Sequence, residues 1–195
     1  MRILQLVCVS VVALSFVQSA RAQELKYRAF LDGASESPVQ DTPGFGTALV
    51  TFDLDLITMH VEASFADLKQ NTTASHIHCC TVNPNVLTAG VATNTPSFTG
   101  FPLGVTSGTY DHLFDMSLAS SYNAAYITAN GGTVGSAFNA LLAGIAAEKS
   151  YFNIHTSFAT GGEIRGFLHL VPEPSSLLLT LFGAMGLFVR RRRKA

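Results

Sequence analysis

Apolar and polar residues alternate along much of the central part of this 195-residue chain. In residues 24–31 (ELKYRAFL), every second side chain from Leu25 to Leu31 is apolar, and Lys26 and Arg28 lie between them. A period of two places the apolar side chains on one face of an extended strand. Similar patterns predict further strands over residues 46–55, 57–67, 74–80, 150–158 and 163–170.

One segment has the period of a helix instead. In residues 133–147 (TVGSAFNALLAGIAA), apolar side chains recur every three to four residues, and Thr133 can cap the first turn. Residues 88–108 are rich in Gly, Pro, Thr and Ser and are expected to be mostly loop. Six to eight strands with one inserted helix predict a mainly β fold. We expect an antiparallel β-sandwich or barrel of immunoglobulin-like or Cu/Zn-superoxide-dismutase-like architecture.

The N-terminal segment, residues 1–22, has the layout of a secretory signal peptide. Arg2 precedes an apolar run, and the small residues Ala20 and Ala22 close the segment two positions apart. A basic start, an apolar run too short to span a bilayer and a small-x-small triplet together predict export, with cleavage before Gln23.

The C-terminal segment, residues 171–195, has three parts in order. The motif Pro172-Glu173-Pro174 comes first, and an apolar stretch at 177–189 that predicts a short helix follows it. A basic cluster at 190–194 ends the segment and contains Arg190, Arg191, Arg192 and Arg193. The apolar stretch is shorter than the 20 or so residues that cross a bilayer, and the basic cluster would stay in the cytoplasm. These features are typical of a weak, late membrane anchor.

The three parts of this tail resemble the PEP-CTERM sorting signal of Gram-negative bacteria. The resemblance implies that an exosortase-type processing enzyme cuts the tail near the Pro-Glu-Pro motif. The chain would then be exported through the inner membrane, anchored there transiently, and sent to the cell surface or extracellular matrix. Proteins with this signal are associated with biofilm-forming cells that produce exopolysaccharide. The alternative, an ordinary C-terminal anchor, would need a longer apolar segment.

Between the two ends lies one predicted domain, residues 23–170, with an acidic charge balance. Five Lys and Arg side chains and twelve Asp and Glu side chains leave it a formal charge of −7 with neutral histidines. Nucleic-acid binding requires a basic footprint, so the composition argues against that class of partner. An acidic, well-solvated surface suits a secreted protein.

Histidines on two predicted strands form the main candidate site. His76 and His78 are two residues apart and would share one face of their strand, and His155 lies on a later strand. Imidazole is a common ligand of first-row metals, so these three residues would favour copper or zinc. His112 is a candidate fourth ligand.

Glu163 and Arg165 lie on the next predicted strand, across a turn at Gly161 and Gly162. If this turn closes a hairpin, His155 comes close to one of them. Glu163 would then orient a ligand imidazole, and Arg165 would guide an anion or pair with Glu163. The alternative interpretation is that the histidines hydrogen-bond within a buried polar network and fix the hairpin.

Cys79 and Cys80 are the cysteines that remain once the signal segment is removed. In an oxidising compartment they can bond to each other, pair with another chain, or act as thiolate ligands. A regular strand cannot point His78, Cys79 and Cys80 in the same direction, so at least one cysteine faces away from the histidines. A vicinal disulfide or a turn is the first expectation.

Four segments of the body resemble the CHRD domain, which is named for its occurrence in chordin. They read FLDGASESPVQDTPGFGTALVTFD, SHIHCCT, GTYDHLFDM and YFNIHTSFATGGEIRGFL, and the resemblance runs from about residue 27 to residue 168. It implies a secreted β-rich domain without an established enzymatic activity. The strand His-x-His and the later histidine are also similar to the copper-binding arrangement of Cu/Zn superoxide dismutase. The bridging histidine and separate zinc ligands of that arrangement are not found here.

Two functions from different classes follow from these patterns. The first is a non-catalytic structural or binding role in an exopolysaccharide-rich biofilm, with exopolysaccharide or other surface proteins as partners. It is favoured because no nucleophile elbow, phosphate loop or HExxH helix occurs. The second is a metal-binding or redox protein that uses His76, His78 and His155.

Overall fold

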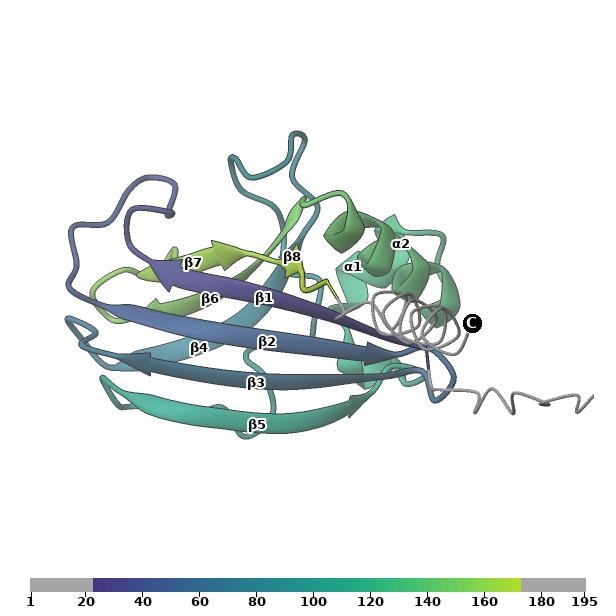
Figure 1. Ribbon diagram of the computed structural model, residues 1–195, viewed down its shortest axis with the longest axis horizontal. Helices are drawn as coiled ribbons and strands as arrows, with labels where there is room; N and C mark the ends of the chain where they lie inside the picture. The colour runs from purple at the N-terminus through teal and green to yellow at the C-terminus, as the bar shows by residue number, and fades with distance from the viewer. Residues whose placement is uncertain (1–22, 173–195) are drawn as a thin grey trace, which may run out of the picture.

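Within residues 23–172, eight antiparallel strands form one sheet that curls into a half-barrel (Figure 1). The computed structural model describes residues 23–172. Along the sheet the strands run in the order β4, β6, β7, β1, β2, β3, β5, and the short β8 pairs with β1. Their bounds are β1 Glu24–Asp32, β2 Phe45–Asp53, β3 Thr58–Ala66, β4 Thr72–Cys79, β5 Gly108–Asp115, β6 Ser150–Thr156, β7 Ile164–Phe167 and β8 His169–Leu170.

The alternating sequence patterns correspond to these strands. In β2 and β3, buried and more exposed side chains alternate along the whole strand, with Val50, Phe52 and Met59 fully buried. A one-residue slip in pairing would turn these side chains toward solvent, so burial fixes the register. The mainly β, antiparallel fold that the sequence predicts is confirmed, and it is built as a single curved sheet.

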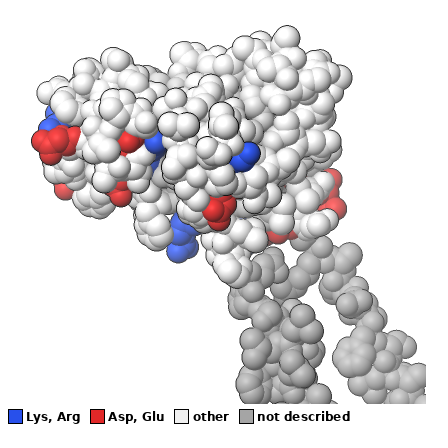
Figure 2. Space-filling model, turned by 90° about the horizontal axis from the view of Figure 1, so that it is seen from above, with Lys and Arg blue, Asp and Glu red and all other residues white. Residues whose placement is uncertain are grey.

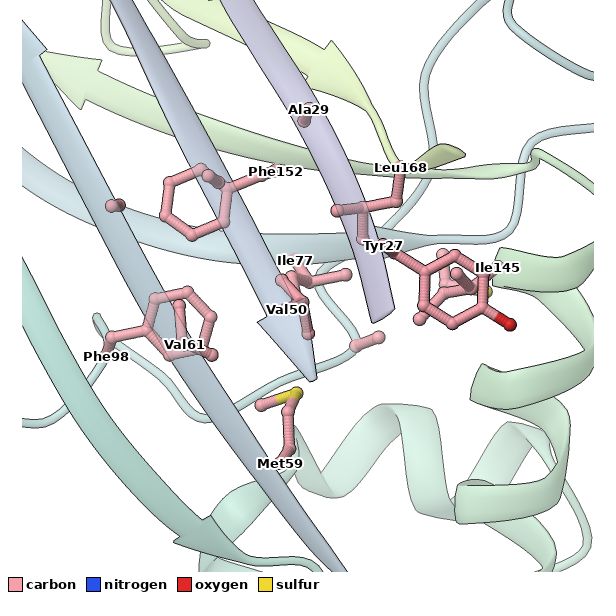
Figure 3. Close-up of a cluster of buried hydrophobic side chains, with 14 of the residues drawn as sticks. Tyr27, Ala29, Val50, Met59, Val61, Ile77, Phe98, Ile145, Phe152 and Leu168 are labelled. Carbon is pink, nitrogen blue, oxygen red and sulfur yellow. The ribbon is translucent and has the colours of Figure 1, made fainter. Parts of the chain in front are cut away.

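The buried hydrophobic side chains form one core between the strands (Figure 3). Val50, Val61, Ile77 and Phe152 meet there from four different strands and are each 0% exposed. Among the described residues, every strand pairing and the whole core lie within residues 24–170. We expect the body between the two terminal segments to fold as one unit.

Two helices and a short 3₁₀ turn of the described part of the chain cover one end of the half-barrel (Figure 1). The helix expected near 133–147 is confirmed as α2, Val134–Ala146, and Thr133 caps it in a capping box with Ser136. The turn η1, Ala119–Ser121, and the helix α1, Ala124–Ala129, were not predicted.

The strands β4, β6 and β7 are buried on both faces. Every residue of β6 and β7 is buried, whereas β1, β2 and β3 alternate between buried and exposed positions. The core covers one face of these strands. Segments from the β1–β2 and β4–β5 loops contact side chains of the other face, as the bonds from Arg165 to the carbonyls of Ser35 and Leu87 show.

The face toward which these two loops project in Figure 1 is mostly uncharged, and the described residues form no continuous basic patch on it (Figure 2). Within residues 23–172, no helix is long and apolar enough to cross a membrane. The predicted signal peptide, the apolar stretch at 177–189 and the basic cluster at 190–194 lie outside the described residues.

Candidate metal centre

Pairing between β4 and β6 brings the three predicted histidine ligands together. His76 lies opposite Asn153, His78 opposite Tyr151, and Ala74 opposite His155. Residues at alternate positions of paired strands share one face of the sheet, so all three imidazoles stand on the face away from the core.

The three imidazoles converge to a compact group. One ring nitrogen from each lies within 4.8 Å of the other two. The Nε2 atoms of His78 and His155 are 3.4 Å apart, and the ring centroids of His76 and His155 are 4.9 Å apart. The three side chains are only 6–8% exposed. Among the described residues this is the one group of three or more His, Cys, Asp or Glu side chains with such convergent ligand atoms.

Backbone carbonyls set the orientation of two of the rings. Nδ1 of His78 lies 2.9 Å from the carbonyl oxygen of Ala89, and Nδ1 of His155 lies 2.9 Å from that of Thr160. A carbonyl oxygen only accepts, so each Nδ1 must carry the hydrogen. In the neutral rings both Nε2 atoms are then bare acceptors, and their lone pairs face each other across 3.4 Å.

Burial keeps these histidines uncharged near neutral pH. Loss of hydration lowers the pKa of both His76 and His78 to about 4, and it also lowers the pKa of His155. The neighbouring imidazoles contribute to this fall at both residues, whereas the hydrogen bond to Ala89 opposes it at His78. A proton therefore does not bridge the two Nε2 atoms at neutral pH.

Tyr151 and Arg165 form a stack behind His78. The Tyr151 and His78 rings are parallel within 5°, with centroids 4.8 Å apart. The Arg165 guanidinium lies 4.7 Å from the centre of the Tyr151 ring. Arg165 also donates to the carbonyls of Ser35 and Leu87, and so it ties both covering loops to the sheet.

Glu163 does not take the orienting position that the hairpin geometry suggested. Its carboxylate accepts hydrogen bonds from the hydroxyls of Thr42 and Thr156 and from the backbone N–H of Lys69. The reason is the turn before it: Gly162 has a φ of 129°, and β7 begins only at Ile164. The Glu163 side chain therefore does not lie on the face that strand alternation predicts. Backbone carbonyl groups orient the imidazoles of His78 and His155 instead.

Arg165 and His112 also differ from the expectation. Arg165 pairs with Glu36, at 3.7 Å between Nε and a carboxylate oxygen, and not with Glu163. His112 lies on β5, at the other end of the strand order from β4, where its ring packs between Tyr110 and Phe114. It does not belong to the convergent group.

Cys79 and Cys80 form a disulfide at the end of β4. Cys79 is buried and Cys80 is exposed. Both sulfur atoms lie directly against Gly144 of α2, where a Cβ would overlap them. The disulfide therefore packs the end of β4 against α2, and a side chain at position 144 would disturb this contact.

Asn153 and Glu36 are polar residues of this region that the sequence reasoning did not assign to the site. Asn153 is 1% exposed and Glu36 is 6% exposed. The period of two already placed Asn153 on the face of His155, so its position could have been found. Glu36 comes from the β1–β2 loop, and no local pattern connects it to the histidines.

Two protein-family models match the chain. The CHRD domain matches residues 27–168, and the PEP-CTERM protein-sorting motif matches residues 170–194. Neither the curated proteins nor the solved structures contain a match to this sequence. The CHRD match includes all three histidines and the disulfide.

Proposed function

Because the chain belongs to the CHRD domain family and ends in a PEP-CTERM sorting motif, we propose that it is an exported protein whose domain binds copper or zinc. The ligands are His76, His78 and His155. The observation that carries this proposal is the pair of Nε2 lone pairs that face each other in a buried site.

The spacing of these atoms fits a tetrahedral metal. Zn–N bonds of about 2.0–2.1 Å at tetrahedral angles put two ligand nitrogens about 3.3–3.4 Å apart. His78 and His155 have 3.4 Å between their Nε2 atoms. The outer separation of 4.8 Å in the group is wider. We therefore expect the His76 ring to turn inward when the metal is bound.

The donor set also suits these metals chemically. Neutral imidazoles favour zinc and copper over the hard cations, which prefer oxygen ligands. The low pKa values of the three rings remove proton competition near neutral pH. Three protein ligands leave a fourth position for a small molecule, which is where a bound metal would supply Lewis-acid or redox chemistry.

Metal analysis of the body, residues 23–170, tests this proposal. We expect one copper or zinc per chain in the unmodified protein after loading and dialysis, and loss of that metal in the double variant His76→Ala/His78→Ala. His112→Ala is the matched control, because this strand histidine also packs among aromatic rings but lies outside the group. Substoichiometric metal that the double variant does not change would refute the site.

The sorting motif implies processing by an exosortase-type system. We propose that the processed protein reaches the cell surface or the extracellular matrix of an exopolysaccharide-rich biofilm, where its domain has a binding role. Replacement of Glu173 by Ala should leave the full-length chain in the inner-membrane fraction. The control Glu62→Ala, on the exposed face of β3, should be processed and released. Equal release of both variants would contradict this route.

A further inference from the structure

Asn153 connects the histidine group to a second buried polar cluster. His76, Asn153 and Arg165 lie directly opposite one another on β4, β6 and β7, in a single row across three strands. Directly opposite residues of paired strands place their side chains on the same face. Glu36 covers this row from the β1–β2 loop and contacts both Arg165 and the Asn153 amide.

Three buried polar atoms in this region make no hydrogen bond of normal geometry within the described residues. They are Nδ1 of His76, Oδ1 of Asn153 and Oε1 of Glu36, and the three residues are 6%, 1% and 6% exposed. The Asn94 backbone lies near His76, and the Ser37 N–H and the Asn153 amide lie near the Glu36 carboxylate. A buried polar atom left without a good partner is costly, so two such atoms in the row and a third in the loop that covers it indicate that something else binds there.

Two of these atoms are close neighbours. Oδ1 of Asn153 and Oε1 of Glu36 both lie 2.5 Å from the point where a Cβ on Gly162 would stand, so they are at most about 5 Å apart. Gly162 has no side chain and a φ of 129°, and it thereby leaves room for both groups. The pair presents two hydrogen-bond acceptors beside the histidine group.

Arg165 does not use up the acceptor capacity of Glu36. Its Nε lies 3.7 Å from Oε2 of Glu36, beyond hydrogen-bond distance, and its N–H groups donate to the carbonyls of Ser35 and Leu87. The guanidinium holds the carboxylate in place by charge, while Oε1 makes no hydrogen bond of normal geometry. A free cation is disfavoured here because Arg165 is adjacent.

We propose that Asn153 and Glu36 form an accepting pocket for the fourth ligand of the metal, a neutral oxygen ligand that donates hydrogen bonds, in the simplest case water. This inference rests on the proposed metal site. Water can donate one hydrogen to each acceptor while its oxygen binds the metal. An anion would instead meet two acceptor atoms and the charge of Glu36, so the pocket selects against anions.

Azide is a suitable probe because it binds Cu(II) but donates no hydrogen bond. Its affinity is measured by optical titration of the copper-loaded body at pH 8. Burial raises the pKa of Glu36 to about 7, and Arg165 opposes the rise, so the carboxylate is mostly ionised at this pH. We expect Glu36→Gln, which removes the charge, to bind azide at least about tenfold more tightly than the unmodified protein.

Asn153→Asp adds a negative charge to the same pocket and should weaken azide binding at least about tenfold. A purely structural role of these residues would move both variants in the same direction. Glu62→Gln, an exposed carboxylate on β3, is the control and should keep the azide affinity of the unmodified protein.

Metal content is measured before every titration, which separates the two proposals. If the unmodified protein binds no copper, both proposals, the metal site and the accepting pocket, are refuted. If copper binds but the azide affinity of both variants changes less than twofold, only the proposal of the accepting pocket is refuted. If Glu36→Gln fails to fold, Asn153→Asp alone decides, and an unchanged or tighter azide affinity in it would overturn the pocket.

Discussion

Acid should destabilise the metal-free domain through His76 and His78. Burial holds the pKa of each at about 4, compared with an ordinary value of 6.5. The unfolded chain therefore takes up protons near pH 6.5, whereas the folded chain does not do so until about pH 4. The contribution of each histidine to the free energy of unfolding is full above pH 6.5 and is lost as the pH falls. Between pH 7.5 and pH 5 this loss is about 2 kcal/mol for each histidine.

Glu36 acts in the opposite direction over the same interval. Burial raises the pKa of its carboxyl group from 4.5 to about 7. The unfolded chain loses this proton near pH 4.5, and the folded chain loses it only near pH 7. The contribution of Glu36 to the free energy of unfolding is therefore full below pH 4.5 and is lost as the pH rises through 7. Acidification from pH 7.5 to pH 5 therefore raises the free energy of unfolding by about 2 kcal/mol through Glu36. This gain offsets about half of the loss that the two histidines cause.

Urea denaturation followed by circular dichroism, with a chelator present, separates these contributions. Relative to the unmodified body, Glu36→Gln should lose about 2 kcal/mol more on going from pH 7.5 to pH 5. Over the same interval, the double variant His76→Gln/His78→Gln should lose about 4 kcal/mol less unfolding free energy than the unmodified body. The lowered pKa of His155 adds a loss that all three proteins share. Parallel pH profiles for the three proteins would refute the assignment of these buried groups.

Three substitutions probe the surroundings of the site. Gly144→Ala should destabilise the body by about 1–3 kcal/mol in urea denaturation, because its Cβ would overlap the disulfide, whereas Gly135→Ala in the same helix has open space and should stabilise it by about 0.5–1 kcal/mol. Arg165→Met should cost about 3–5 kcal/mol at pH 8 by leaving Glu36 buried without its partner, and the double variant with Glu36→Gln should recover part of this loss. Thr133→Ala should cost about 1 kcal/mol and lower the helical signal, since it removes the cap of α2.

The strands and the shared face of His76 and His78 could be predicted because both follow from the geometry of a single strand. An extended chain turns alternate side chains to opposite faces whatever surrounds it. The helix α2 was predictable for a similar reason, since its apolar side chains repeat with the helical period and Thr133 caps it. The six-residue α1 is too short to show such a repeat.

Features that depend on distant parts of the chain were not predictable in the same way. The prediction for Glu163 was wrong because the positive φ of Gly162 interrupts the alternation just before β7, and Thr42 and Thr156 supply partners for the carboxylate. Glu36 reaches Arg165 only because β1 lies next to β7 in the sheet, and the order of the strands cannot be read from a local pattern.

The polar side chains on β4, β6 and β7 have a different meaning from those on the other strands. Alternating polar residues normally indicate a face that water covers, as Glu62 and Ser64 of β3 show. On β6 the same pattern is buried, because loops close over a face that carries Tyr151, Asn153 and His155. Covering this face with apolar residues would give a more stable sheet, since buried polar groups contribute little even when they are paired. A polar layer kept between the sheet and the loops, with atoms in it that make no hydrogen bond of normal geometry, therefore supports the proposal that a ligand binds there.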